Sequence, residues 1–157
     1  MLRIVAALAA VAVGASFAYA QNLDIIKQRR ETMRVIAGAS SPNFKMMKGD
    51  VPFDLAVVQA NLKTIEEQAA KFKTQFPDDS KTGGGTDVSP TIWTARAEFD
   101  GTIDKWIASA KSAAAAIKDE ATFKANYPAF SAGCGGCHKA TEGFTIALGE
   151  SFKKPKP

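Results

Sequence analysis

The chain has 157 residues, the size of about one domain, and carries a formal net charge of +4. Its lysines and arginines are scattered, and no array of base-stacking aromatic residues accompanies them, so the charge does not indicate a nucleic-acid partner. The chain contains a single histidine, which excludes a metal site built on two of its own histidines.

The N-terminus has the pattern of a secretory signal peptide. Arg3 precedes an apolar run from Ile4 to Val13, and Ala18-Tyr19-Ala20 matches the small-residue cleavage signal. The run is too short for a comfortable membrane span, so we expect removal of residues 1–20 and no membrane anchor afterwards. Residues 21–157 would then form a single domain outside the cytosol, where free thiols oxidise unless they are capped.

Two helices are predicted in the first half of this domain. The first runs from about Leu23 to Ala39, because apolar residues recur on one face, and it ends at Gly38 or at Ser40-Ser41-Pro42. The second begins at Leu55. Its apolar positions alternate in steps of three and four residues, as in the seam of a left-handed helix bundle, at Leu55, Val58, Leu62, Ile65, Ala69, Phe72 and Phe76.

A loop and a third long helix follow. Residues 77–85 are rich in turn formers and are predicted to form a surface loop. Ser89 suits an N-cap and Pro90 the first helical position, so a continuous helix is expected from there to Ile117. Its apolar stripe consists of Ile92, Ala95, Phe99, Ile103, Trp106, Ala110, Ala113 and Ile117.

The last predicted helix has the apolar stripe Phe123, Tyr127, Phe130, Cys134 and Cys137. Pro128 lies inside this pattern, where it should kink the helix or mark its effective start. No segment has a convincing strand pattern. The sequence therefore predicts an all-α fold, an antiparallel up-down-up-down four-helix bundle with a cofactor in its core.

The cofactor is indicated by Cys134-Gly135-Gly136-Cys137-His138, a C-x-x-C-H motif typical of covalent c-type haem attachment. Each thiol can add across one haem vinyl group to give a thioether. On a helix these three side chains share one face, because they are spaced i, i+3 and i+4. The two glycines would let the haem lie close to the backbone, or they form a flexible turn.

Two other interpretations of the motif are weaker. A redox-active C-x-x-C pair usually lies in a βαβ unit, and no strand is predicted here. A structural zinc site would need a fourth ligand, but the chain has no further cysteine or histidine.

Several features together carry a family resemblance. These are the late C-x-x-C-H motif, Arg29 four residues before Met33, the Lys48-Gly49 turn, and Phe76-Pro77-Asp78 through Ser80-Lys81 leading to Pro90-Thr91-Ile92-Trp93. In these features, over nearly the whole chain after residue 20, the protein resembles the class II cytochromes c, which comprise cytochrome c′ and its low-spin relatives. The resemblance implies a periplasmic protein with one covalent haem c, commonly a homodimer through its first two helices.

The resemblance also implies roles for particular residues. His138 would be the proximal iron ligand, and Cys134 and Cys137 the thioether anchors. Met33 would lie over the distal haem face. Arg29 would approach a haem propionate, although periodicity alone does not decide whether Arg29 or its neighbour Arg30 points inward.

Trp93 would lie near the haem edge, although core packing explains Trp93 and Trp106 equally well. The chain departs from the family pattern after His138. Family members carry an aromatic and then a basic residue where this chain has Thr141 and Glu142. Lys139 is a possible substitute for that cation.

Function depends on the sixth iron position. The chain has no second histidine, so methionine is the common strong-field ligand left for this position. Met33 is the candidate by its position in the family pattern, and Met46 and Met47 are alternatives by chemistry only. If Met33 binds iron, the protein suits one-electron transfer between Fe(III) and Fe(II) with redox partner proteins. If Met33 only packs over the haem, the distal face can bind nitric oxide or carbon monoxide. Enzymatic turnover is not expected, because no distal acid–base histidine exists.

Overall fold

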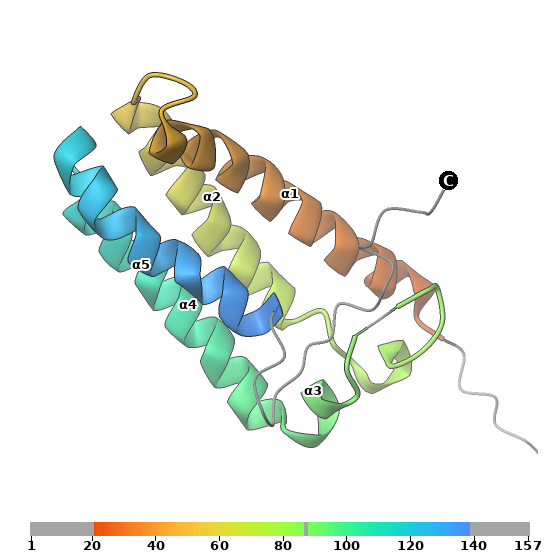
Figure 1. Ribbon diagram of the computed structural model, residues 1–157. Helices are drawn as coiled ribbons and strands as arrows, with labels where there is room; N and C mark the ends of the chain where they lie inside the picture. The colour runs from red at the N-terminus through yellow and green to blue at the C-terminus, as the bar shows by residue number, and fades with distance from the viewer. Residues whose placement is uncertain (1–20, 87, 139–157) are drawn as a thin grey trace, which may run out of the picture.

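The computed structural model describes residues 21–86 and 88–138, so the predicted signal peptide and the segment after His138 lie outside the described residues. Within the described ranges there is no strand, which confirms the all-α prediction. The elements are α1 (Leu23–Lys48), α2 (Leu55–Lys73), the 3₁₀ helix η1 (Asp78–Ser80), α3 (Thr91–Thr94), α4 (Arg96–Ala116) and α5 (Glu120–His138). Helices α1, α2, α4 and α5 form the predicted antiparallel bundle (Figure 1).

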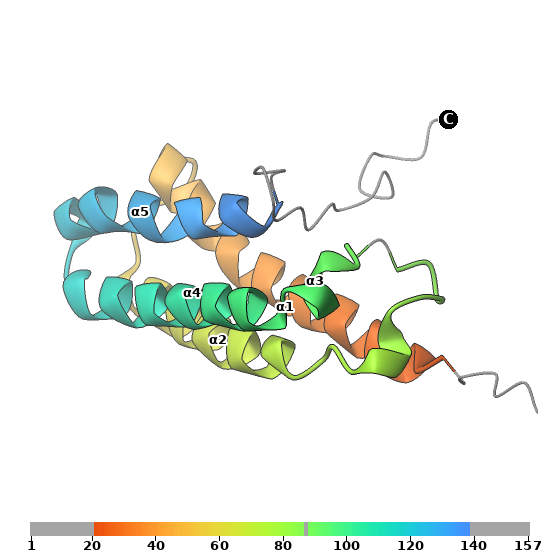
Figure 2. The same ribbon diagram turned by 90° about the horizontal axis from the view of Figure 1, so that it is seen from below.

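The bundle is closely packed on three of its sides. Helix α1 packs on α2, α2 on α4, and α4 on α5, whereas the backbones of α1 and α5 hardly approach each other. Figure 2 shows the reason: α1 runs obliquely, with its C-terminal end beside α5 and its N-terminal end on the other side of the bundle. At the close end, the rings of Phe44 and Tyr127 meet edge to face with centroids 5.7 Å apart.

Helix α1 is longer than predicted. It continues through Pro42 to Lys48, so the predicted ends at Gly38 and at Ser40-Ser41-Pro42 are wrong. Beyond Pro42, Asn43 and Met46 are buried in the bundle, and this packing holds the last turns in helical form. The helix ends at Gly49, whose φ of 78° is the left-handed conformation of a C-cap. The Lys48-Gly49 turn is therefore confirmed.

The predicted third helix is broken. Ala95, with φ −119° and ψ 46°, separates the short α3 from α4, so Trp93 and Trp106 lie on different helices. Burial explains the apolar stripe nonetheless, since Ile92 on α3 and Phe99 and Ile103 on α4 are buried in one small core cluster. The spacing of apolar residues indicates which face of a segment is buried. It does not reveal that the chain changes direction at a single residue, because the same face stays buried on both sides.

Helix α5 begins well before Pro128. Asp119 caps it, because its side chain accepts a hydrogen bond from the backbone N–H of Thr122 at 2.8 Å. The prediction that Pro128 marks the effective start is therefore wrong. Phe123, Tyr127 and Phe130 are buried in the main core cluster, which holds the helix to the bundle on both sides of the proline. No helix of the described ranges is both long and apolar enough to span a bilayer.

Candidate functional site

The C-x-x-C-H motif forms the last turn and a half of α5, which confirms its helical placement and makes the flexible-turn interpretation of its glycines wrong. Both thiols are half-buried and are not joined in a disulfide, and His138 is exposed at the helix end. Burial raises the pKa of both thiols and lowers the pKa of the His138 imidazole. The motif is thus a pair of neutral thiols beside an imidazole on one helix face.

Met33 lies across the open side of the bundle from His138. The Phe44–Tyr127 contact sets the register of the antiparallel helices α1 and α5. Met33 precedes Phe44 by eleven residues, and His138 follows Tyr127 by eleven. At 1.5 Å per residue, both lie about 16 Å from that contact in the same direction. Met33 and His138 therefore share one level of the bundle, on the side where the two helix backbones stand apart.

Met46 and Met47 lie at the opposite end. The sulfur of Met46 accepts a hydrogen bond from the backbone N–H of Asp54, the N-cap of α2, at 3.4 Å. Met46 lines a hollow together with Glu120, the first residue of α5, and Met47 follows Met46 in the last turn of α1. They are far along the bundle from His138, and the structure excludes them as its partners in this fold.

Arg29 is buried, with 3% of its surface exposed, while Arg30 is exposed. This settles which of the two arginines points inward. The guanidinium of Arg29 is surrounded by oxygens of the segment between α2 and α3. Its Nη1 donates to Gln75 O at 3.5 Å and to Ser80 Oγ at 3.1 Å, and its Nη2 donates to Ser80 O at 3.1 Å and to Thr86 Oγ1 at 2.5 Å.

None of these acceptors carries a charge. Among the residues that the structure describes, no ion pair involves Arg29. The rings of Phe76 and Trp93 lie 5.0 and 6.0 Å from its guanidinium carbon. Burial and the adjacent Arg30 lower the pKa of Arg29 to about 10, so it stays charged at neutral pH. A buried cation is expected to have an anionic partner, which the described part of the chain does not supply here.

Gln75 is a residue that the sequence analysis missed. It is 1% exposed, and neither its side-chain oxygen nor its nitrogen has a hydrogen-bond partner. Its backbone carbonyl is one of the acceptors of Arg29. Nothing in the sequence distinguishes this glutamine from a solvated one at a helix end. A buried cation without an anion and a buried amide without a partner fit a site for the carboxylate group of a haem.

Trp93 belongs to the same region. Its indole N–H donates to Phe76 O at 3.1 Å and to Pro77 O at 3.2 Å, and its ring packs against Phe76. It is therefore anchored to the end of α2, beside Arg29. Its predicted position at the haem edge stays a prediction.

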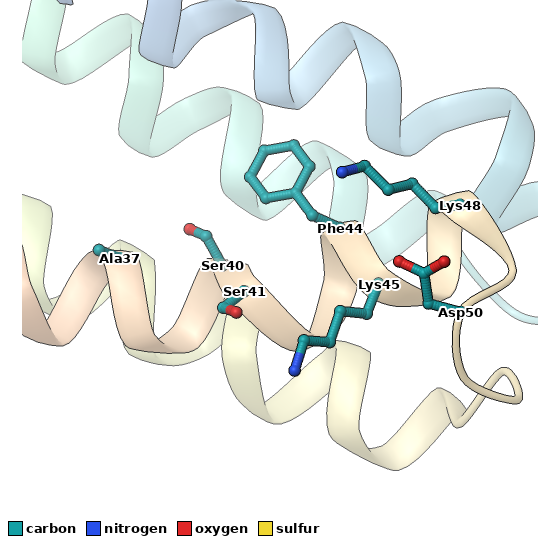
Figure 3. Close-up of a pocket in the computed structure, with 7 residues that line it drawn as sticks. All are labelled: Ala37, Ser40, Ser41, Phe44, Lys45, Lys48 and Asp50. Atoms are coloured by element: carbon teal, nitrogen blue, oxygen red, sulfur yellow. The ribbon is translucent and has the colours of Figure 1, made fainter.

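A surface hollow near the end of α1 is separate from these residues. It is lined by Ala37, Ser40, Ser41, Phe44, Lys45, Lys48 and Asp50, and Figure 3 shows the Phe44 ring projecting from α1 among them. None of the predicted site residues lines this hollow. The candidate site is at the other end of the bundle, between the N-terminal half of α1 and the C-terminal half of α5.

Comparison with known proteins shows the family of the chain. The family model for cytochrome c′ matches residues 24–140. A cytochrome c′ of Rhodopseudomonas palustris is 42% identical over 137 residues, which cover 87% of this chain and 93% of that protein. A cytochrome c-556 of the same organism is 33% identical over 149 residues, which cover 88% and 95%.

The fold agrees as well. The structure of a Rhodopseudomonas palustris cytochrome c′ superposes with a TM-score of 0.72 at 40% identity, covering 76% of this chain and 98% of that one. The sequence match, the bundle and the C-x-x-C-H turn of α5 together show that this chain belongs to the cytochrome c′ family, whose members bind one covalent haem c.

Proposed function

We propose that the protein is a one-electron carrier whose haem iron is held by His138 and Met33. The observation that carries the proposal is the shared level of these residues on the open α1–α5 side of the bundle. A bound haem c supplies the Fe(III)/Fe(II) couple, and a methionine sulfur opposite the histidine raises its potential. The relatives include both cytochrome c′ and cytochrome c-556, so the family alone leaves the sixth ligand open.

The chain's residues have distinct tasks in this proposal. Cys134 and Cys137 anchor the haem as thioethers, and the helix holds His138 one residue further on the same face. Met33 is half-buried against the main core cluster, so its sulfur is held in place by packing as well as by any bond to iron. Arg29 compensates the charge of a propionate. Because His138 is the only histidine, no acid–base residue of that type is left for enzymatic turnover.

The optical spectrum of the ferric and ferrous holoprotein, with and without carbon monoxide, tests this function. We expect a low-spin spectrum with the weak far-red sulfur-to-iron band and no response to carbon monoxide. A high-spin spectrum that shifts with carbon monoxide would overturn methionine ligation. It would support the second candidate function, binding of nitric oxide or carbon monoxide at the distal face.

Two variants make the test specific to Met33. Met33→Ala should convert the spectrum to high-spin and lose the far-red band while helix content stays nearly intact. Met47→Ala is the matched control, since Met47 is also half-buried on α1 but lies at the other end of the bundle. An unchanged spectrum in Met33→Ala would contradict iron ligation by Met33.

Location and assembly are also proposals. Removal of residues 1–20 would deliver residues 21–157 to the periplasm without a membrane anchor, where redox partner proteins reduce and oxidise the haem. Within the described ranges, the exposed large apolar residues lie on α1 or shortly after it, namely Leu23, Val35, Phe44 and Val51. They support a homodimer through the first two helices. Analytical ultracentrifugation of the holoprotein tests it, and a monomer at every concentration would contradict it.

A further inference from the structure

The indole of Trp106 carries a buried N–H group without a hydrogen-bond partner. Trp106 lies on α4 and packs against the main core cluster. A buried tryptophan N–H usually finds an acceptor, because burial without one forfeits its hydrogen bonds to water. Trp93, the second of the chain's two tryptophans, obeys this rule through its bonds to Phe76 O and Pro77 O.

The edge of the indole that carries this N–H faces α5 at Gly133, the residue before Cys134. A Cβ atom on Gly133 would lie 3.2 Å from Trp106 Cδ1 and 3.8 Å from Trp106 Nε1. Glycine therefore allows α4 and α5 to approach closely at this level. Cys137 follows Gly133 by four residues and so lies on the same face of α5. The unpaired donor is thus located at the haem-attachment turn.

Helix α5 offers few acceptors there. In residues 129–138 the only side-chain oxygen is that of Ser131, whose hydroxyl donates to Pro128 O at 3.0 Å. Backbone carbonyls up to Cys134 accept from N–H groups one turn later, as in any α-helix. Attachment of a haem adds acceptors to this turn, namely two thioether sulfurs.

We propose that the Trp106 indole N–H donates a hydrogen bond to the covalently attached haem group, which makes Trp106 a positioning residue. The inference rests on the proposed attachment at Cys134 and Cys137. The acceptor is a thioether sulfur, since the thioethers form at the turn that Trp106 faces. Trp106 then holds the haem from α4, while Arg29 contacts it from α1, so polar contacts from two helices fix its orientation.

The chain allows each tryptophan to be observed alone in the holoprotein. Trp93→Phe leaves only Trp106, and Trp106→Phe leaves only Trp93. The ultraviolet resonance Raman bands of indole report whether its N–H is hydrogen-bonded. We expect the bonded signature for Trp106 in Trp93→Phe, as for Trp93 in Trp106→Phe, where the bond is to a backbone carbonyl. A free N–H for Trp106 would overturn the inference.

Haem resonance Raman spectra of the same variants identify the acceptor. Loss of the Trp106 N–H should shift the haem side-group bands of Trp106→Phe relative to wild type, while Trp93→Phe serves as the comparison. We expect a shift in the thioether bands, and a shift confined to the propionate bands would overturn the assignment of a sulfur acceptor. Identical haem bands in wild type and Trp106→Phe would overturn the inference.

Failure of the attachment itself is seen separately. Haem that leaves the denatured polypeptide on acid–acetone extraction would refute the anchor residues. Haem that stays bound while the Trp106 N–H is free would refute only the role of Trp106. If Trp106→Phe does not fold, the Raman spectrum of Trp93→Phe still decides whether the Trp106 N–H is bonded.

Discussion

The ring of Phe44 on α1 meets the ring of Tyr127 on α5 edge to face, with centroids 5.7 Å apart. This contact joins two helices whose backbones otherwise stand apart. It sets the register that brings Met33 and His138 to one level. The contact at one end of the bundle therefore gives the relative level of the two candidate iron ligands toward the other end.

Phe44→Ala should therefore affect both stability and ligation. We expect a loss of about 1–2 kcal/mol from the aromatic contact and the apolar surface, and a weaker far-red sulfur-to-iron band. Urea unfolding and the ferric spectrum measure the two effects. Val35→Ala is the control, because Val35 is 38% exposed and Phe44 41%. Equal losses in the two variants would contradict a special role for the Phe44 ring.

Replacing Arg29 should be far more damaging than replacing its neighbour. Arg29→Ala leaves Ser80 and Thr86 hydroxyls and two buried carbonyls without their donor, at a cost of about 2–4 kcal/mol. Arg30→Ala should cost no more than about 1 kcal/mol, because Arg30 is exposed. Urea unfolding of both holoproteins compares them, and similar losses would show that the burial of Arg29 has little energetic weight.

The charge of Arg29 can be separated from its geometry. Arg29→Gln removes the buried positive charge and should lower the midpoint potential, since a nearby cation favours the ferrous state. Arg29→Lys keeps the charge but loses the planar fork, so its potential should stay closer to wild type although its stability falls. Potentiometric titration measures both variants. A potential in Arg29→Gln equal to wild type would contradict a place for Arg29 beside the haem.

The two anchor cysteines should be required for a compact bundle. Cys134→Ala combined with Cys137→Ala should abolish covalent haem and leave a loose or unfolded chain, because we expect the cofactor to fill much of the core and to stabilise only the folded state. Acid–acetone extraction and circular dichroism check the two parts. Each single variant should keep haem through one thioether. Haem retained by the double variant after extraction would refute the anchor assignment.

Replacement by alanine should change stability in opposite directions at Gly38, inside α1, and at Gly49, its C-cap. Gly38 is helical, and beyond its chain neighbours and the backbone of its own helix no atom lies within 4 Å of the place that a Cβ would take. Gly38→Ala should therefore stabilise the protein by about 0.5–1 kcal/mol. Gly49 has equally open surroundings but a φ of 78°, so Gly49→Ala should destabilise it by about 1 kcal/mol. Thermal unfolding measures the pair, and shifts of equal sign would contradict the backbone explanation.

The helix boundaries could not be predicted from the spacing of apolar residues alone. Pro42 argued for an early end of α1, but the buried Asn43 and Met46 beyond it hold the helix to Lys48. The stripe from Ile92 to Ile117 predicted one helix, yet the chain changes direction at Ala95 while the same face stays buried. At Pro42 packing overrules local propensity, and at Ala95 the apolar periodicity does not register the change of direction.

The features that the sequence did predict, the haem cofactor and the helices, depend on residues close together in the chain. The C-x-x-C-H motif indicates the haem cofactor, and the three-four periodicity of apolar residues indicates helices. Both signals can be found in the sequence because each lies within a few turns of one helix. The inward side of Arg29, the unpaired Gln75 side chain and Trp106 N–H, and the distance of Met46 and Met47 from His138 came only from the tertiary structure. These features depend on how α1, α2, α4 and α5 are placed against one another, and side chains distant in sequence, such as Phe44 and Tyr127, set that placement.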